Sequence, residues 1–308
     1  MRAAVINKHG VPPVFGEFRE PEAQPGEVLI NVTTAGLGGW DVLGEYRLAV
    51  EYPCVIRGEG VGLNPEGKRV YFGERARVPF GAWAERVVVP EAEVWPVPDD
   101  IDDKTAITMA IAGTGSYIPL QDAKIKPGDS VLVLGATGVL GQLGLQLARI
   151  MGAGRVVGAA RNQPALDRLM QRGIADAVVR LGTDDDVAAL KAEAGEGFDV
   201  VLDLVCGAPL MASLKATRWG ARIVTVGAGA GLMVSFNIAD LLFKTMTLIG
   251  TGQRPPDDRR RIWEELLVLA KQHNITVDYT DYDLEQIGDA WQAQKTGAYA
   301  KITSKIKA

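Results

Sequence analysis

The pattern of hydrophobic and polar positions changes near residue 128. Before that point, short apolar runs are separated by glycine and proline, which is typical of a β-rich domain. The runs that predict strands are RAAVIN, EVLINVTTAG, KRVYFG and AERVVVP. Residues 99–121 then follow a helical pattern, and Asp102 or Asp103 can cap the first turn of this helix.

After Gly128, continuous apolar runs alternate with helical segments. The run SVLVLG is apolar throughout, as expected for a strand that is covered on both faces. Further strands are predicted at residues 155–160, 177–181, 199–205, 221–227 and 241–252. Because strands that alternate with helices form right-handed βαβ units, this part is predicted to be an α/β, doubly wound parallel sheet of the Rossmann type. Two amphipathic helices (residues 259–274 and 284–297) and a last strand candidate (300–306) follow.

The composition narrows the class of protein. With 308 residues, the chain is long enough for two domains. A formal net charge of −5 argues against a nucleic-acid-binding protein or a basic membrane-surface protein. No apolar stretch is long enough for a membrane span, the N-terminus lacks the order of a signal peptide, and two cysteines make no disulfide framework. We therefore expect a cytoplasmic protein that acts on a small molecule.

A GxxGxxG motif, formed by Gly135, Gly138 and Gly141, stands between the first strand of the alternating region and the helix after it. In a dinucleotide-binding unit, the first glycine permits a tight turn, the second lets the backbone approach the pyrophosphate, and the third lets the helix pack on the strand. The pyrophosphate would lie at the N-terminus of the helix, among unpaired N–H groups. The alternative is a glycine-rich turn that serves packing alone. The cofactor-binding residues predicted here are Gly135, Thr137, Gly138, Val139, Leu140 and Gly141.

The second strand of this region ends without the acid that usually holds the ribose of NAD. That acid is expected about 20 residues after the glycine motif, and Ala160 stands 19 residues after Gly141. Alanine removes the repulsion that a carboxylate would exert on a 2′-phosphate. Arg161 offers a forked donor that suits a phosphate, and Asn162 can add a neutral hydrogen bond. We therefore predict NADPH as the cofactor; the alternative is that Arg161 is a solvated turn residue.

Several stretches resemble the medium-chain dehydrogenase/reductase superfamily, and in particular its zinc-free branch of quinone oxidoreductases and enoyl or alkenal reductases. The resemblance covers essentially the whole chain and rests on AGLGGWDVLGEY, YPCVIRGEGVG, AGTGSYIPL, KPGDSVLVLGATGVLGQLGLQLAR and KTGAYAKITSKI. It implies a β-rich, GroES-like catalytic domain (residues 1–112), a Rossmann domain (113–250) and a C-terminal segment (251–308) that returns to the catalytic domain. It also implies a nicotinamide site between the domains, near Gly227 and Thr251. A homodimer through the strand MTLIGT is implied as well, since the edge of this strand would otherwise be unpaired.

The ligands of a catalytic zinc are missing from the positions where zinc-dependent members of the superfamily have them. The resemblance places Gly38 and Gly58 at the first two ligand positions and Ile111 near the third, while Glu59 is retained. The segment that would form the structural zinc lobe is too short and has no cysteine. Independently of any family, a zinc site of cysteines and histidines needs three or four ligands at compatible spacing, and the two histidines and two cysteines of this chain are far apart in sequence. We therefore predict no metal.

The missing Lewis acid bears on the reaction. Without a metal, oxidation of a simple alcohol loses its usual route to a stabilised alkoxide, whereas a quinone or an α,β-unsaturated carbonyl carries the developing charge on its own oxygen. The protein then supplies positioning, a hydrogen-bond donor and a proton. We predict an NADPH-dependent quinone or enone reductase. The alternatives are a zinc-independent carbonyl or alcohol dehydrogenase and a non-catalytic NADPH-binding protein with a sensing or structural role.

Candidates for the proton donor and the substrate pocket lie in the first domain. Similar enoyl reductases have a Gly-x-Tyr whose phenol contacts or protonates the substrate, and Tyr46 matches it; a packing tyrosine, with water as the proton source, is the alternative. Asp41 is interpreted as a local cap, and Arg57 either pairs with Glu59 or binds a substrate carboxylate. The aromatic residues that could line an apolar pocket are Trp40, Tyr46, Phe80 and Trp83. In a β-rich domain, however, ordinary core positions are the default for such residues.

Overall fold

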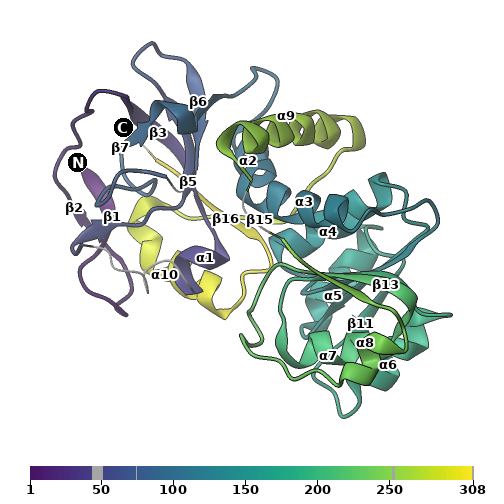
Figure 1. Cartoon of the computed structure of the whole chain (residues 1–308). Coiled ribbons are helices and arrows are strands. Elements are labelled where there is room, and N and C mark those ends of the chain that lie inside the picture. The colour runs from purple at the N-terminus through teal and green to yellow at the C-terminus, as the bar shows by residue number, and fades with distance from the viewer. Residues whose placement is uncertain (44–50, 74, 252–253, 307–308) are drawn as a thin grey trace. The chain divides into compact units, whose positions relative to one another are not determined.

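The structure, a computed structural model, describes all residues except 44–50, 74, 252–253 and 307–308. The chain divides into two compact units. Unit 1 comprises Met1–Ile111, Pro255–Gln272 and Thr276–Ala308, and unit 2 comprises Ala112–Arg254 and His273–Ile275. The C-terminal part of the chain therefore belongs to the same unit as the N-terminal part, and its path can be followed by colour in Figure 1.

Unit 1 consists mainly of strands. They are β1 (Arg2–Ile6), β2 (Val14–Glu17), β3 (Glu27–Leu37), β4 (Cys54–Val55), β5 (Glu59–Leu63), β6 (Arg69–Phe72), β7 (Arg86–Pro90), β8 (Val94–Pro96), β15 (Tyr279–Asp281) and β16 (Lys301–Lys305). The helical segments are α1 (Gly39–Leu43), α2 (Asp103–Thr108), α9 (Pro256–His273), α10 (Ile287–Thr296) and 3₁₀ turns at Glu91–Glu93 and Leu284–Gln286. Strand β3 is central: it pairs with β7 and also lies in the sheet β15-β16-β3-β5-β6-β8, while β2-β1-β4 form a second sheet. Apolar side chains of β1, β3, β7, α10 and β16 form the main core of the unit.

A buried ion pair joins the C-terminal strand β16 to β5 across β3. Lys301 Nζ donates to Glu59 Oε1 at 2.6 Å, and both residues are only 3% exposed. The other carboxylate oxygen of Glu59 accepts a hydrogen bond from the Tyr71 hydroxyl at 2.9 Å. Gly36, in β3, leaves room for the pair, because a Cβ atom there would lie 3.2 Å from Lys301 Cε and 3.3 Å from Glu59 Cγ. Each charge depends on the other, since burial keeps water from replacing a lost partner.

Unit 2 alternates strands and helices. Its strands are β9 (Ser130–Leu134), β10 (Arg155–Ala160), β11 (Ala177–Arg180), β12 (Phe198–Asp203), β13 (Thr217–Thr225) and β14 (Thr247–Gly250). Its helices are α3 (Thr114–Asp122), α4 (Val139–Ile150), α5 (Gln163–Gln171), α6 (Asp186–Ala194), α7 (Gly207–Lys215) and α8 (Ile238–Leu242). A turn of π-helix, Met109–Gly113, leads from α2 into α3.

The six strands of unit 2 are parallel and lie in the order β11-β10-β9-β12-β13-β14. The chain begins in the middle at β9, moves outward to β11 and then returns to β12 on the other side of β9. In open α/β sheets, ligands bind at such a reversal, beyond the carboxyl ends of the strands. Helices α3 and α4 pack together on one face, and α6 and α7 pack together on the other (Figure 1). The predicted fold class is thus confirmed: a Rossmann-type parallel sheet, with a separate β-rich unit.

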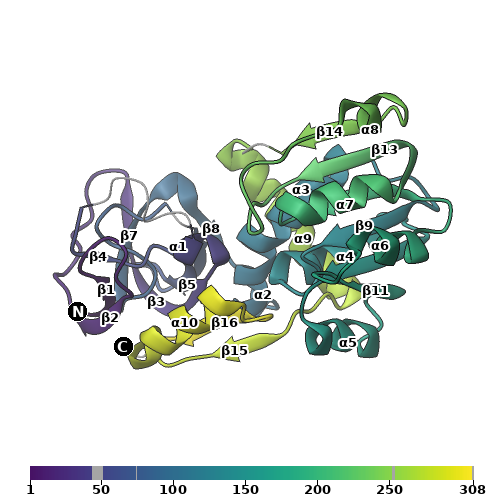
Figure 2. The ribbon, with the colours of Figure 1, turned by 90° about the horizontal axis from the view of Figure 1, so that it is seen from below.

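Strand β14 lies at one edge of this sheet, beside β13 (Figure 2). Leu248, in the strand, is 41% exposed. Leu242, which ends α8, and Phe243 after it are 66% and 82% exposed. An open strand edge beside exposed apolar side chains is a surface on which another chain can pair and pack.

The predicted elements were wrong in two places. The helix predicted over residues 99–121 is interrupted, because α2 ends at Thr108 and a π-helical turn separates it from α3. The strand predicted in residues 241–252 is shorter, because Asn237 caps α8, and the strand begins only at Thr247. Among the helices of the described residues, none is long and apolar enough to span a bilayer.

Replacing Lys301 by methionine should destabilise the protein strongly. Methionine fills the space but leaves the Glu59 carboxylate buried without its cation, and breaking a buried pair in this way costs about 3–5 kcal/mol. Urea unfolding followed by circular dichroism measures the loss. The double variant Lys301→Met/Glu59→Gln removes both charges and should recover most of it. An equal loss in both variants would show that packing, and not the uncompensated charge, is what the single substitution removes.

Candidate functional site

The glycine motif forms the turn between β9 and α4. Gly135 has a φ of +80°, a left-handed conformation that favours glycine. A Cβ atom at Gly141 would lie 2.4 Å from the carbonyl oxygen of Gly135, so the first turn of α4 packs directly on the loop. Around Gly138 there is more space, since the nearest atom to a Cβ there would be 3.6 Å away. The three glycines therefore have the geometry of a tight turn, a close packing contact and an open backbone position.

The N-terminus of α4 is open to a ligand. Its N-cap residue, Gly138, has no side chain to satisfy the first N–H groups of the helix. Two buried side chains hold the surrounding backbone: the Ser116 hydroxyl donates to the Leu140 carbonyl oxygen at 2.8 Å, and the Gln142 amide donates to the Thr137 carbonyl oxygen at 3.1 Å. The N–H groups and the positive end of the helix dipole are thus positioned for an anion such as a pyrophosphate.

A free cation follows β10. Ala160 ends the strand, and Arg161 after it is exposed and forms no hydrogen bond or ion pair with the rest of the described chain. The Arg161 side chain extends toward the loop after β11, where its Cγ would lie 3.7 Å from a Cβ atom at Gly182. Asn162 caps α5, because its Oδ1 accepts a hydrogen bond from the Ala165 N–H at 2.8 Å, and its amide N–H groups remain as donors. Two side chains with donor groups therefore stand at the end of β10.

The loops after β12 and β13 are in backbone contact next to the glycine motif. A Cβ atom at Gly227 would lie 2.1 Å from the carbonyl oxygen of Leu204. Asp203, the last residue of β12, holds the first of these loops, since its Oδ1 accepts hydrogen bonds from the N–H groups of Val205 and Cys206 at 3.1 and 2.8 Å. Burial raises the pKa of the Asp203 carboxyl, which has no exposed surface. Cys206, in the same loop, is a buried free thiol.

Thr251 directly follows β14 and is half-buried. The cofactor-binding residues predicted from the sequence therefore lie at the ends of β9, β10, β13 and β14. Because these strands are parallel, one sheet brings all of these residues to its carboxyl edge.

In unit 1, the positions that match zinc ligands have no metal-binding side chain. The N–H groups of Gly38 and Gly58 instead donate to the two carboxylate oxygens of Asp41, at 2.8 and 3.2 Å. Asp41 is buried, which agrees with its interpretation as a local cap. Ile111 is 40% exposed, and its N–H points to Glu59 Oε2 at 3.5 Å. Within the part of the chain that the structure describes, no three His, Cys, Asp or Glu residues are grouped so that they could hold a metal ion.

Glu59 has a partner that sequence reasoning missed. Lys301 and Tyr71 both donate hydrogen bonds to its carboxylate. The partner considered from the sequence was Arg57, two residues earlier in the chain, which is half-buried. One signal for Lys301 exists in the strand KITSK, where period-two alternation places it on the same face as the buried Thr303. The role of Arg57 toward a substrate stays a prediction.

The aromatic candidates have different surroundings. Trp83 is fully buried, and its indole N–H donates to a backbone carbonyl of β3 at 3.1 Å. Phe80 is buried in the same core, whereas Trp40, in α1, is 59% exposed. Tyr46 lies outside the described residues, so its role as proton donor stays a prediction.

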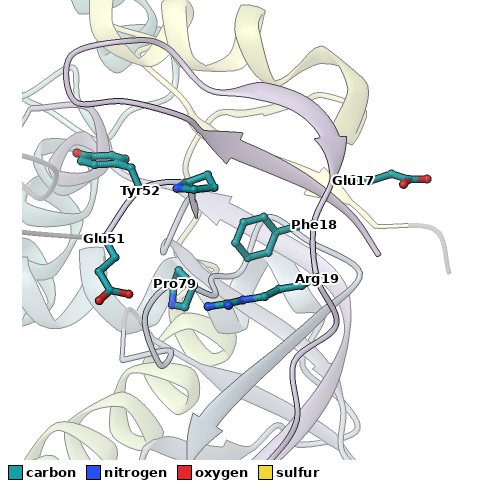
Figure 3. A pocket seen from close by; sticks show the side chains of 7 residues that line it. Glu17, Phe18, Arg19, Glu51, Tyr52 and Pro79 are labelled. Atoms are coloured by element: carbon teal, nitrogen blue, oxygen red, sulfur yellow. The ribbon is translucent and has the colours of Figure 1, made fainter.

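A cavity of about 640 Å³ opens on unit 1 (Figure 3). Its lining residues are Glu17, Phe18, Arg19, Glu51, Tyr52, Pro53 and Pro79. The Arg19 guanidinium lies 5.7 Å from the ring centre of Phe80, and Glu17 points away from the other labelled side chains (Figure 3). The described candidate residues are not among those that line this cavity.

Comparison with known proteins links these observations to a family. A family model described as zinc-binding dehydrogenase matches residues 139–271, a range that excludes the three zinc-ligand positions. A quinone oxidoreductase-like protein 2 homolog from Nematostella vectensis is 26% identical over 313 residues, which cover 94% of this chain and 85% of the relative.

Two solved structures share the fold over nearly the whole chain. The quinone oxidoreductase from Thermus thermophilus, whose complex with NADPH was also solved, has a TM-score of 0.79 at 26% identity, covering 99% of this chain and 100% of that one. A thermostable alcohol dehydrogenase from Pyrobaculum aerophilum has a TM-score of 0.83 at 25% identity, covering 99% of both chains. Together with the glycine motif at the carboxyl edge of a six-stranded parallel sheet, these matches assign the family: the chain belongs to the medium-chain dehydrogenase/reductase superfamily.

Proposed function

We propose that this protein is a metal-free, NADPH-dependent oxidoreductase that delivers hydride to a quinone or to the double bond of an α,β-unsaturated carbonyl. The observation that carries the proposal is the exposed Arg161 guanidinium, which binds no other described residue and stands next to Ala160 instead of an acid. The similarity to the quinone oxidoreductase from T. thermophilus, for which an NADPH complex exists, supports the same cofactor and acceptor class.

The residues at the carboxyl edge of unit 2 fit such a cofactor. The open N-terminus of α4 suits the pyrophosphate, and Arg161 with Asn162 suits the 2′-phosphate. Gly227 and Thr251 are the residues that we assign to the nicotinamide end. An acid at position 160 would repel a 2′-phosphate, and alanine does not. When bound, NADPH supplies the hydride.

The residues at the zinc-ligand positions favour an acceptor that is already polarised. Two of them are glycines, and the Asp41 carboxylate close to them is bound to their N–H groups. Oxidation of a simple alcohol usually relies on a metal-bound alkoxide, whereas a quinone or enone holds the developing negative charge on its own oxygen. The chain then contributes a hydrogen-bond donor and a proton, for which Tyr46 and water are the candidates.

Replacing Arg161 by alanine should weaken NADPH binding by about ten- to hundredfold, because hydrogen bonds to charged groups contribute about 1.5–3 kcal/mol. NADH has no 2′-phosphate, and its affinity should not change. Fluorescence titration of the purified protein with each cofactor measures both affinities. Lys191→Ala, which removes one positive charge from the last turn of α6, is the control. Equal affinity of the unmodified protein for NADPH and NADH would rule out the proposed cofactor preference.

The protein should oxidise NADPH with quinones or enones at the same rate before and after treatment with EDTA, since no step relies on a metal. Loss of this activity on chelation would contradict the proposal. Simple alcohols with NADP⁺ are the comparison substrates. Their turnover by the EDTA-treated protein would favour a zinc-independent alcohol dehydrogenase, the activity named for the P. aerophilum relative. Tight NADPH binding without turnover of any acceptor would favour a sensing or structural role.

We also propose that two copies of the chain associate through β14. The strand is at the sheet edge, and Leu248, Leu242 and Phe243 beside its backbone are exposed apolar side chains. A second copy can pair with the same edge around a two-fold axis, so that one surface serves both partners. Such pairing would satisfy backbone groups that are otherwise left to water.

Replacing Leu248 by lysine should convert the dimer into a monomer, because the charge would be buried opposite its own copy. Sedimentation velocity at micromolar concentration separates the two states. Met170→Lys changes an apolar residue of the same exposure (41%) on α5, which packs on β10 and β11 at the other side of the same sheet, and should leave the dimer intact. A monomeric unmodified protein would disprove the association.

A further inference from the structure

The outer strand β11 places a second arginine beside Arg161. Strands β10 and β11 are parallel neighbours, and Ala160 is in register with Arg180, the last residue of β11. The N–H of Leu181 donates to the Ala160 carbonyl oxygen at 2.8 Å, so the pairing continues to the very end of both strands. Because neighbouring strands lie about 4.8 Å apart, the strand ends that carry the two arginines are adjacent.

Both guanidinium groups are exposed and uncompensated. Neither Arg161 nor Arg180 forms a hydrogen bond or an ion pair with another residue in the described ranges. Three other arginines of the same unit, Arg149, Arg155 and Arg222, each have a carboxylate oxygen within 2.6–2.7 Å. The two free arginines therefore leave uncompensated positive charge at adjacent strand ends, which is favourable for an anion.

The acids nearest in sequence serve the loop itself. Asp186 accepts hydrogen bonds from the N–H groups of Gly182 and Thr183 and from the Thr183 hydroxyl. Asp185 caps the N-terminus of α6, and Asp184 is exposed. Two of these three carboxylates thus accept hydrogen bonds from backbone N–H groups and pair with neither arginine. Both guanidinium groups are therefore available to a bound anion.

We propose that Arg180 is a second ligand of the cofactor's 2′-phosphate, and that Arg161 and Arg180 together determine the preference for NADPH over NADH. This inference rests on the proposed cofactor. A phosphate monoester carries between one and two negative charges at pH 7 and has three acceptor oxygens, which two forked guanidinium groups can share. The Arg161 side chain already extends toward the β11 loop, along Gly182, and Ala160 between the arginines adds no opposing charge.

The test compares binding of 2′,5′-ADP and 5′-AMP, which differ only in the 2′-phosphate, to the full chain by isothermal titration calorimetry. Arg180→Ala should weaken 2′,5′-ADP and NADPH by about tenfold, as expected for the loss of one charge-assisted hydrogen bond. Binding of 5′-AMP and NADH should stay unchanged. The double variant Arg161→Ala/Arg180→Ala should bind 2′,5′-ADP no better than 5′-AMP. Arg180→Lys keeps the charge without the fork and should fall between the unmodified protein and the alanine variant.

Two controls keep the outcomes separate. Lys191→Ala changes the net charge equally and should not affect either nucleotide. The thermal unfolding temperature of ligand-free Arg180→Ala should not fall, because the exposed Arg180 side chain has no partner among the described residues. If the unmodified protein binds 2′,5′-ADP and 5′-AMP equally, the proposed cofactor itself fails. If it prefers 2′,5′-ADP and only Arg161→Ala reduces that preference, the cofactor stands and the role of Arg180 is overturned.

Discussion

Backbone contact at the carboxyl edge of the parallel sheet is the constraint on which unit 2 depends. Gly141 packs on the carbonyl oxygen of Gly135, and Gly227 packs on that of Leu204, at distances that leave no space for a Cβ atom. These contacts hold the loops after β9, β12 and β13 together and set the N-terminus of α4 at the same edge. A side chain at either position would separate the loops. The same glycines therefore allow the close packing of the fold and shape the site that we propose for the cofactor.

Unit 1 shows how the chain uses the carboxylates close to the positions that match zinc ligands. Asp41 binds two backbone N–H groups, and Glu59 is held by Lys301 and Tyr71. An acid that already has donors on both oxygens is a poor cation ligand, because binding a metal would strip it of those partners. Positions 38, 58 and 111 have no ligating side chain, and the acids close to them are paired within the protein. Both features disfavour the binding of a metal ion at this place.

Most strands and helices of unit 2, and its glycine motif, could be predicted because they depend on local periodicity and spacing. Strand β5 was missed because EGVGL is rich in glycine, which is uncommon in strands. The pair between Lys301 and Glu59 was missed because its residues are 242 positions apart and meet only through the pairing of β16 and β5 with β3. Arg161 follows from its distance to the glycine motif, whereas Arg180 is identified only once the register of β10 and β11 is known. Local chemistry was readable from the sequence, and contacts set by strand pairing were not.

The location of the two free arginines also bears on how an acidic protein would hold the polyanionic cofactor that we propose. The chain has a net charge of −5, but at physiological salt charges separated by more than about 8 Å are largely screened. If the proposed cofactor binds, the groups within that range of its 2′-phosphate therefore decide between NADPH and NADH. The ends of β10 and β11 carry Arg161, Arg180 and the neutral Ala160, while Asp185 and Asp186 nearby are bound to the backbone of their own loop. Under the proposed function, we therefore expect selectivity for a phosphorylated ribose to depend on short-range contacts at these two strand ends more than on the overall charge of the protein.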